Sequence, residues 1–245
     1  MKRFLDILIS GFLLIVLSPI IILFSILVFL QDFKSPFYLG TRVGRDFKNF
    51  KMIKLRSMVV NADASGVNST SSDDLRITPL GTVIRKIKLD ELTQLLNVLN
   101  GSMSLVGPRP QVQEDTNLYS SEERNLLSAR PGITDFSSII FADEGEILKD
   151  YDDPDLGYQQ LIRPWKSRLG LIYVTNHNAI LDFRLILLTA YSVINRNAAI
   201  RGVVRELVKL KVSDDIVEVA SRQKELVPSI APGKKNIFSS RIDHS

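Results

Sequence analysis

An uncharged apolar segment, residues 7–30, constrains the fold of this chain more than any other feature. As a straight helix it would be about 36 Å long, at about 1.5 Å per residue, which is enough to cross the hydrocarbon core of a bilayer. A cleaved signal peptide would have a shorter apolar region followed by a small-residue cleavage site, whereas this run continues into Gln31-Asp32-Phe33-Lys34. The segment therefore predicts a membrane helix.

Two arrangements of this helix remain open, a straight span and a hairpin that re-enters the same face of the membrane. Pro19 removes a backbone donor and frees the carbonyl near Ile15, which Ser18 can partly satisfy, so a bend is tolerated in lipid. A straight span would place one of the two basic flanks outside the cell, against the positive-inside tendency. We favour the re-entrant hairpin on these grounds. The basic residues are Lys2 and Arg3 before the run, and Lys34, Arg42, Arg45, Lys48, Lys51, Lys54 and Arg56 after it.

The composition restricts the chemistry that the chain can perform. It has 245 residues, a net charge of +4 and no cysteine, which excludes disulfides, thiol nucleophiles and cysteine metal sites. The two histidines, His177 and His244, lie far apart in the sequence. Catalysis must therefore use carboxylates, hydroxyls, Lys, Arg or a recruited ion. A basic chain suits phosphate-bearing substrates and anionic lipid, and the interrupted basic patches argue against nucleic acid as a partner.

The remaining sequence predicts a mostly helical α+β fold. The predicted elements are one or two short strands in residues 36–60 with a turn at Gly44-Arg45-Asp46, a polar loop at 61–75, a helix after Gly81, a helix carrying Leu89, Leu92, Leu96 and Leu99 on one face and ending at Asn100-Gly101, a helix at 119–130, and buried or membrane-surface helix at 171–195.

The C-terminal region allows two interpretations. Apolar residues recur at helical spacing beside basic ones, which fits either an amphipathic helix on anionic lipid or a helix packed on its own domain. Residues 221–245 predict a flexible tail. We divide the chain into a re-entrant helix at 1–33, a membrane-associated catalytic domain with amphipathic surface helices at 34–198, and a C-terminal helix and tail at 199–245. The apolar positions are Ile200, Val203, Val204 and Leu207, and the basic ones are Arg201, Arg205, Lys209 and Lys211.

Two adjacent acids, Asp90 and Glu91, lie in the first turn of a predicted helix directly after a basic stretch. Acids at this position often serve only to complement the helix dipole. The same setting suits a nucleophilic carboxylate, because the helix amides and the nearby Arg85, Lys86 and Lys88 would keep Asp90 ionised. The sequence leaves both interpretations open.

A rigid turn at residues 101–110 presents Arg109 between Pro108 and Pro110. The guanidinium fork suits the oxygens of a phosphate, although an ordinary turn with a solvated Arg is the alternative. No glycine-rich run ends in Lys-Ser/Thr, so this is not a Walker-type loop. A membrane segment, an acid among cations and a phosphate clamp together suit phosphoryl transfer between a soluble and a lipid substrate.

Ordered motifs over roughly residues 1–195 strengthen this hypothesis. They are Lys2-Arg3-Phe4-Leu5-Asp6, Ser18-Pro19, Arg42-Val43-Gly44, Lys54-Leu55-Arg56-Ser57-Met58, Arg76-Ile77-Thr78, Leu80-Gly81, Leu89-Asp90-Glu91-Leu92, Gln94-Leu95, Asn97-Val98-Leu99, Met103-Ser104-Leu105-Val106-Gly107-Pro108-Arg109-Pro110, Arg130-Pro131-Gly132-Ile133-Thr134, Leu181-Asp182 and Thr189. In this order they closely resemble the bacterial sugar transferase family, the small monotopic phosphoglycosyl transferases.

The resemblance implies a mechanism. Asp90 would attack the phosphorus next to the sugar of a nucleoside diphosphate-sugar, expected to be a UDP-sugar, and release a nucleoside monophosphate. Polyprenyl (undecaprenyl) phosphate would then accept the phosphosugar. Asp90 and Glu91 would hold Mg²⁺, with proton handling as the other role for Glu91, and Arg85 and Arg109 would bind phosphate.

The resemblance also implies a location at the cytoplasmic face of the bacterial inner membrane, among membrane lipids, with a helix broken at Ser18-Pro19. The product would begin O-antigen, capsule or exopolysaccharide synthesis, and a homodimer stays open. Two alternatives are a glycosyltransferase that releases nucleoside diphosphate and a non-catalytic scaffold. Many members follow the Pro-Gly-Ile-Thr stretch with Gly, an Ala-Gln pair and Asn-Gly-Arg, whereas this chain has residues 135–144 instead. Arg163 or Arg168 could replace the missing Arg.

Overall fold

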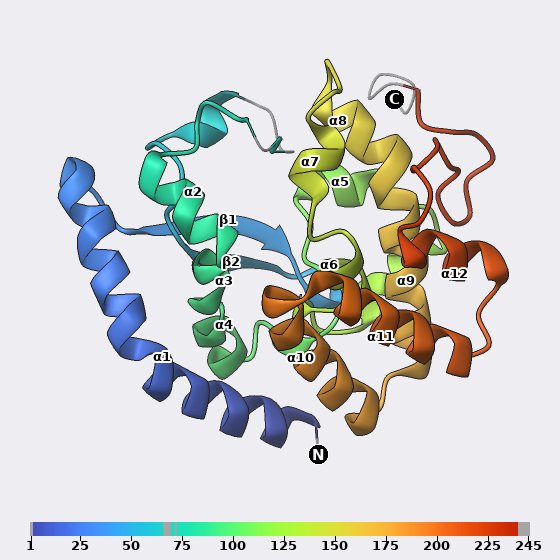
Figure 1. Cartoon of the computed structure of the whole chain (residues 1–245), viewed down its shortest axis with the longest axis horizontal. Coiled ribbons are helices and arrows are strands. Elements are labelled where there is room, and N and C mark those ends of the chain that lie inside the picture. Colours follow the sequence, from blue (N-terminus) through green and yellow to red (C-terminus); the bar gives the residue numbers. More distant parts are fainter. Residues whose placement is uncertain (1, 66–69, 72, 240–245) are drawn as a thin grey trace.

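The computed structural model describes residues 2–65, 70–71 and 73–239. It confirms the mostly helical α+β class, with two small two-stranded sheets among many helices. Figure 1 shows one of these sheets lying between groups of helices. The helices are α1 (Lys2–Asp32), α2 (Pro79–Lys86), α3 (Leu89–Leu92), α4 (Leu95–Asn100), α5 (Gln113–Asn117), α6 (Phe136–Ile140), α7 (Glu144–Leu148), α8 (Pro154–Gly157), a π-helical turn (Tyr158–Ile162), α9 (Arg163–Asn176), α10 (Ala179–Ile194), α11 (Arg196–Lys209) and α12 (Asp214–Ser221); the strands are β1 (Phe37–Val43), β2 (Asn49–Leu55), β3 (Ser104–Val106) and β4 (Gly132–Thr134); and 3₁₀ turns cover Arg45–Phe47, Ala62–Ser65 and Glu123–Ser128.

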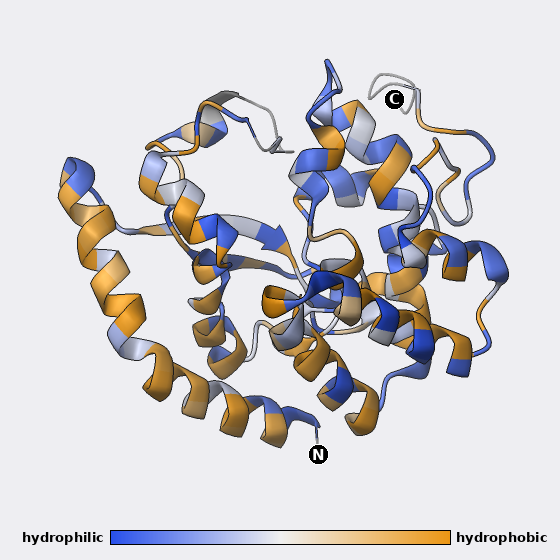
Figure 2. Ribbon diagram, in the orientation of Figure 1, coloured by the Kyte–Doolittle hydropathy of each residue, from blue (hydrophilic) through white to orange (hydrophobic). Residues whose placement is uncertain are grey.

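Helix α1 is the one described helix that is long and apolar enough to cross a membrane. It stays continuous through Pro19 and bends along one side of the domain, with α2, α3 and α4 on its inner side (Figure 1). Ser18 Oγ donates to the carbonyl of Ile15 at 2.8 Å, which confirms the predicted compensation for the missing donor of Pro19. The helix is apolar over most of its length (Figure 2), and many of its side chains are exposed.

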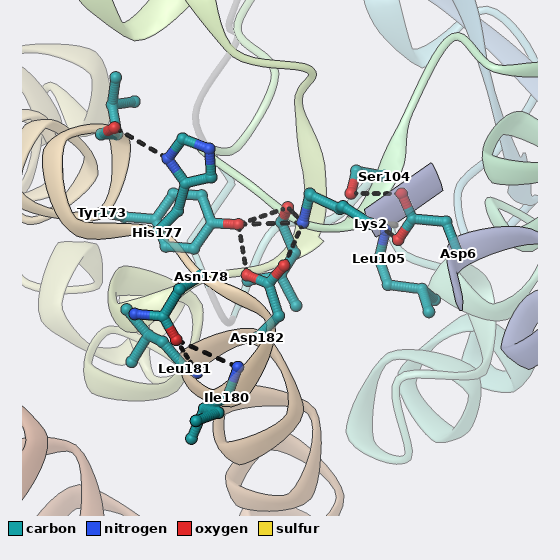
Figure 3. A network of polar contacts seen from close by, with 12 residues as sticks. Lys2, Asp6, Ser104, Leu105, Tyr173, His177, Asn178, Ile180, Leu181 and Asp182 are labelled. Carbon is teal, nitrogen blue, oxygen red and sulfur yellow. Dashed lines mark hydrogen bonds and ion pairs between the residues drawn. The ribbon is translucent and has the colours of Figure 1, made fainter. Parts of the chain in front are cut away.

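The N-terminal end of α1 is fastened to the core by charged groups (Figure 3). Lys2 Nζ donates to Asp182 Oδ2 at 2.6 Å and to the hydroxyl of Tyr173 at 3.1 Å. One turn later, the buried carboxylate of Asp6 accepts a hydrogen bond from Ser104 Oγ at 2.9 Å. These bonds connect α1 to α9, α10 and β3.

The C-terminal end of α1 is fastened to the same domain. Arg56 Nη2, just after β2, donates to Asp32 Oδ1 at 2.6 Å. Val28 is 1% exposed and belongs to a small apolar cluster with Leu55 of β2 and Ile84 of α2. Both ends of a long apolar helix therefore contact one globular domain.

Residues 36–60 contain two short strands and the predicted turn at 44–46. Strands β1 and β2 pair antiparallel, and Asp46 in the turn has a φ of 54°. Helix α4 covers the outer edge of β2. The Asn97 side chain accepts from the amide of Ile53 and donates to the carbonyl of Lys51, both at 2.8 Å. This leaves β1 as the outer strand of the sheet.

The parallel pair of β3 and β4 fixes the turn that carries Arg109. A Cβ on Gly132 would lie 2.1 Å from the amide nitrogen of Gly107, so the two backbones approach as only glycines allow. The amide of Gly132 donates to the carbonyl of Pro108 at 3.0 Å. The residue before Arg109 is therefore held by a backbone bond.

The predicted leucine-rich helix is wrong in its detail, because the structure has two short helices, α3 and α4. The hydroxyl of Thr93, between them, donates to the carbonyl of Ile53 at 3.0 Å, which ties this junction to β2. After the junction Leu95 and Val98 are buried, whereas Leu96 is 43% exposed. The predicted helix at 119–130 is likewise reduced to a 3₁₀ turn at Glu123–Ser128.

The C-terminal region packs on the rest of the globular domain. Ile200, Val203 and Leu207 of α11 are at most 4% exposed and belong to the domain's buried residues, which favours the second interpretation of this helix. Residues 222–239 of the predicted flexible tail contact the domain in the structure: the amide of Ser229, for example, donates to the carbonyl of Gln160 at 2.9 Å. Residues 240–245, and residues 66–69 and 72 of the predicted polar loop, lie outside the described part of the chain.

Candidate active site

The two acids lie where the sequence predicts, in the first turn of α3. Helix α2 ends at Lys86, and Lys88 turns the chain toward α3 in a left-handed conformation with a φ of 55°. Asp90 is 8% exposed, and the Glu91 side chain is 18% exposed. A left-handed conformation is uncommon for a lysine, and here it redirects the chain from the end of α2 into the turn that carries the two acids.

Cations from two other elements surround these acids. Lys54 Nζ of β2 lies 3.5 Å from Glu91 Oε1 and 3.9 Å from Asp90 Oδ2. Arg109 Nη2 donates to the same Oε1 of Glu91. The structure thus brings Asp90, Glu91 and Arg109 together, and places Lys54 beside them. Arg85 influences Asp90 only through space, because it makes no ion pair among the described residues.

The role of Lys54 was missed in the sequence, where it was one of several basic residues after the membrane segment. Lys54 follows Met52 by two residues on β2, so the two side chains lie on the same face of the strand. Met52 is 5% exposed, which makes this the inward face. A cation at an inward position of a strand needs a partner, since burial of an unpaired charge is costly. That pattern was the available signal.

The two carboxyl groups titrate in opposite directions. Burial raises the pKa of Asp90, and Lys54 only partly opposes this. Burial acts on Glu91 in the same way, but Arg109 and Lys54 together outweigh it and hold the pKa of Glu91 below its usual range. The direction for Asp90 is opposite to the expectation that neighbouring basic residues keep it ionised, because the nearest cations bond mainly to Glu91.

The oxygens that remain available suit a hard cation. Glu91 meets both cations through Oε1. Among the described residues, Glu91 Oε2 and both carboxylate oxygens of Asp90 have no hydrogen-bond partner. No group of three potential metal-ligating side chains occurs in the described part of the chain. Mg²⁺ commonly takes one or two carboxylates, waters and substrate phosphates, so Asp90 and Glu91 fit such an ion once a diphosphate is bound.

A recess beside Arg109 extends the site away from β2. It is lined by Asp135, Tyr158 and Lys166, among other residues, and Lys166 lies 5.1 Å above the centre of the Tyr158 ring. Lys166 is paired with Glu144 of α7. A second charged surface therefore lies next to the acid pair.

Neither arginine considered as a substitute for the missing family Arg is available. Arg163 is buried and bonded to the buried Glu123 at 2.7 Å. Arg168 stacks on Trp165, 4.5 Å from the ring centre, and donates to the carbonyl of Ile230 at 2.7 Å. Arg163 thus holds α9 to the 3₁₀ turn at Glu123–Ser128, and Arg168 holds α9 to the C-terminal tail. The arrangement as a whole offers a carboxylate nucleophile among fixed positive charges, which suits transfer of a phosphoryl group.

Comparison with known proteins identifies the family. The model of the bacterial sugar transferase family matches residues 1–196. The exopolysaccharide production protein ExoY of Sinorhizobium fredii is 40% identical over 148 residues, which cover 54% of this chain and 66% of ExoY. An uncharacterized sugar transferase of Bacillus subtilis, EpsL, is 34% identical over 195 residues, 79% of this chain and 87% of EpsL.

A third relative is the UDP-glucose:undecaprenyl-phosphate glucose-1-phosphate transferase of Caulobacter vibrioides, 32% identical over 173 residues, 68% of this chain and 65% of that protein. The chain thus spans just under two thirds of ExoY and of the Caulobacter protein. The family match nevertheless includes α1, the acid pair, Arg109 and all of α10. The chain belongs to the bacterial sugar transferase family.

Proposed function

We propose that this chain is a phosphoglycosyl transferase. It moves a sugar 1-phosphate from a UDP-sugar to undecaprenyl phosphate and so begins the synthesis of exopolysaccharide, O-antigen or capsule. The observation that carries this proposal is the pair of buried Asp90 and partly buried Glu91, held between Lys54 and Arg109 in a domain that is attached to an apolar helix. The printed names of ExoY and of the Caulobacter protein support it.

The reaction proceeds in two displacements at one phosphorus. A carboxylate oxygen of Asp90 attacks the phosphorus bonded to the sugar, and the bond from that phosphorus to the nucleoside phosphate breaks. UMP leaves with the electron pair, and the sugar phosphate stays on Asp90. An oxygen of undecaprenyl phosphate then attacks the same phosphorus and releases the carboxylate. Arg109 and Lys54 offset the charge that spreads over the phosphoryl oxygens.

Asp90 and Glu91 would hold Mg²⁺ through the oxygens that the two basic side chains leave available. The ion would neutralise part of the charge of the donor diphosphate. Arg109 keeps Glu91 ionised and in place for this role. Arg85 adds positive charge near Asp90 without a direct contact.

Mass spectrometry tests the proposed function. Purified protein is incubated with a panel of UDP-sugars and no lipid acceptor. We expect UMP release and a mass increase equal to one sugar phosphate on the peptide that contains Asp90. Release of UDP would instead support the glycosyltransferase alternative. Intact donor with every sugar tested would support the non-catalytic scaffold.

We also propose that α1 re-enters the cytoplasmic face of the membrane. A straight span would carry one end about 30 Å across the hydrocarbon core, out of reach of a domain on the other side. Lys2 and Asp32, at the two ends, both bond to the catalytic domain. The exposed apolar side chains of α10 would rest on the same membrane surface. They are Ile180, Phe183, Leu187, Tyr191, Val193 and Ile194.

Cysteine labelling in intact cells tests this topology without background, since the chain has no cysteine. One variant carries a cysteine added ahead of Met1, and the other carries Lys34→Cys, at an exposed position just after α1. We expect an impermeant maleimide to label neither variant in intact cells and both after lysis. Labelling of one flank alone in intact cells would mean that the helix spans the membrane.

A further inference from the structure

One face of the β1–β2 hairpin carries polar residues that the proposed mechanism does not use. Tyr38 lies opposite Lys54, and Gly40 lies opposite Met52. Directly opposed residues of an antiparallel pair share a face, and alternate residues along a strand do too. Tyr38, Gly40 and Arg42 therefore lie on the face from which Lys54 reaches the acid pair.

Gly40 allows two functional groups to meet above the strand. A Cβ at this position would lie 2.7 Å from Tyr38 Cε1, 2.9 Å from the Tyr38 hydroxyl oxygen and 3.1 Å from Arg42 Nη1. The phenol and the guanidinium thus both lie over Gly40, in space that any side chain would occupy. This arrangement forms a small polar platform of Tyr38, Gly40 and Arg42.

Arg42 has no acidic partner among the described residues, unlike Arg109 and Arg56. Arg109 is paired with Glu91, and Arg56 is paired with Asp32. Arg42 Nη1 donates to the carbonyl of Thr41 at 2.8 Å, and the guanidinium forms no ion pair with any described residue. A guanidinium with donors to spare is suited to bind phosphate oxygens.

The position of β1 indicates which phosphate this would be. Strand β1 begins shortly after α1 ends and is the outer strand of its sheet. Its other face carries exposed Phe37 and Leu39, and exposed Phe33 precedes it at the end of α1. A lipid lying along these apolar side chains would bring its headgroup to the edge of β1. The recess lined by Tyr158 and Lys166 lies instead beside Arg109, which leaves a separate approach for the soluble donor.

We propose that Tyr38 and Arg42, brought together over Gly40, bind the phosphate of the lipid acceptor and position it for the second displacement. This inference rests on the proposed function. One acceptor oxygen forms the new bond to the phosphorus on Asp90, and the bond from that phosphorus to the carboxylate oxygen breaks, with its electron pair returning to the carboxylate. The platform holds other oxygens of the acceptor phosphate and takes no part in the covalent change.

The two displacements can be measured separately. The first is the rate at which the protein with UDP-sugar alone forms adduct and releases UMP. The second is the rate at which isolated adduct loses its phosphosugar to undecaprenyl phosphate in detergent. For Arg42→Ala we expect adduct formation within about 2-fold of the unmodified protein. We expect discharge to fall by about 10-fold to 100-fold, as for loss of a charge-assisted hydrogen bond.

Two further variants sharpen the comparison. Gly40→Ala places a methyl group where the phenol and guanidinium lie, so discharge should fall while adduct formation is retained. Lys51→Ala removes a cation from the opposite face of the same hairpin, where Lys51 Nζ donates to Thr41 Oγ1 at 2.7 Å, and should change neither rate. Adduct formation also reports that each variant is folded, because it requires the assembled acid pair.

An equal fall of both rates in Arg42→Ala would place this residue on the donor side or in the fold, and would overturn the inference. Unchanged discharge in both Arg42→Ala and Gly40→Ala would also overturn it. Failure of the proposed function would give a different result: the unmodified protein itself would form no adduct. In that case the inference about Tyr38 and Arg42 would also be wrong.

Discussion

Asp90→Asn is expected to abolish the phosphosugar adduct and to lower turnover on the order of 10⁴-fold or more. The amide has nearly the same size and shape as the carboxylate but carries no negative charge and is a poor nucleophile. Asp90 accepts no hydrogen bond through its carboxylate among the described residues, so within them the substitution removes only the 3.9 Å ion pair with Lys54. Intact mass and released UMP measure the two expected losses.

A matched acidic variant makes this prediction specific. Asp46→Asn changes an exposed acid in the hairpin turn, whose side chain pairs only with Arg45 in the described structure, and should leave adduct formation unchanged. Normal UMP release by Asp90→Asn, at the rate of the Asp46→Asn control, would contradict the proposed mechanism. An adduct on another peptide would move the nucleophile elsewhere.

Local features of the sequence predicted those parts of the site that depend on local structure. Residues 7–30 predicted α1, and the alternation in residues 36–60 predicted short strands with a turn at Gly44-Arg45-Asp46. The basic stretch before Asp90 predicted a helix start with two acids in its first turn. Each of these depends on neighbours within a few residues, where period and turn chemistry act directly.

Features that depend on tertiary contacts could not be read in this way. Lys54 meets Glu91 because the register of β2 against α3 turns it inward. The break between α3 and α4 coincides with a bond from Thr93 to Ile53, 40 residues away in the sequence. The tail at 222–239 is polar enough to predict flexibility, yet its carbonyls find donors such as Arg168 on α9. Sequence periodicity carries no information about such partners.

The pKa of Asp90 shows the same limit. Neighbouring basic residues in the sequence predicted an ionised carboxylate. In the fold, burial outweighs their effect on Asp90, because Arg109 and Lys54 lie closer to Glu91. The basic residues in the sequence predicted cations near the acid pair. The tertiary packing determines that Lys54 and Arg109 pair mainly with Glu91.

Removal of divalent cations is expected to lower adduct formation on the order of 10³-fold or more. The donor brings a diphosphate to a site where two acids already face two close cations, Lys54 and Arg109. Burial raises the pKa of Asp90 and so disfavours the charged form that must attack. A divalent ion on the available oxygens of Asp90 and Glu91 would offset the negative charge of the diphosphate. It would also favour the charged form of Asp90. UMP release in excess EDTA, with and without added Mg²⁺, measures the loss and its recovery.

The control is EDTA already saturated with Mg²⁺, which should leave the rate unchanged and exclude a direct effect of the chelator. Glu91→Gln should raise the Mg²⁺ concentration needed for half-maximal adduct formation, because it removes one of the two carboxylates and leaves Asp90 as the remaining one. A full rate in EDTA would mean that Lys54 and Arg109 neutralise the donor without an ion. In that case Glu91 would act chiefly to hold these two cations in place. Adduct formation by Glu91→Gln would then not depend on the Mg²⁺ concentration.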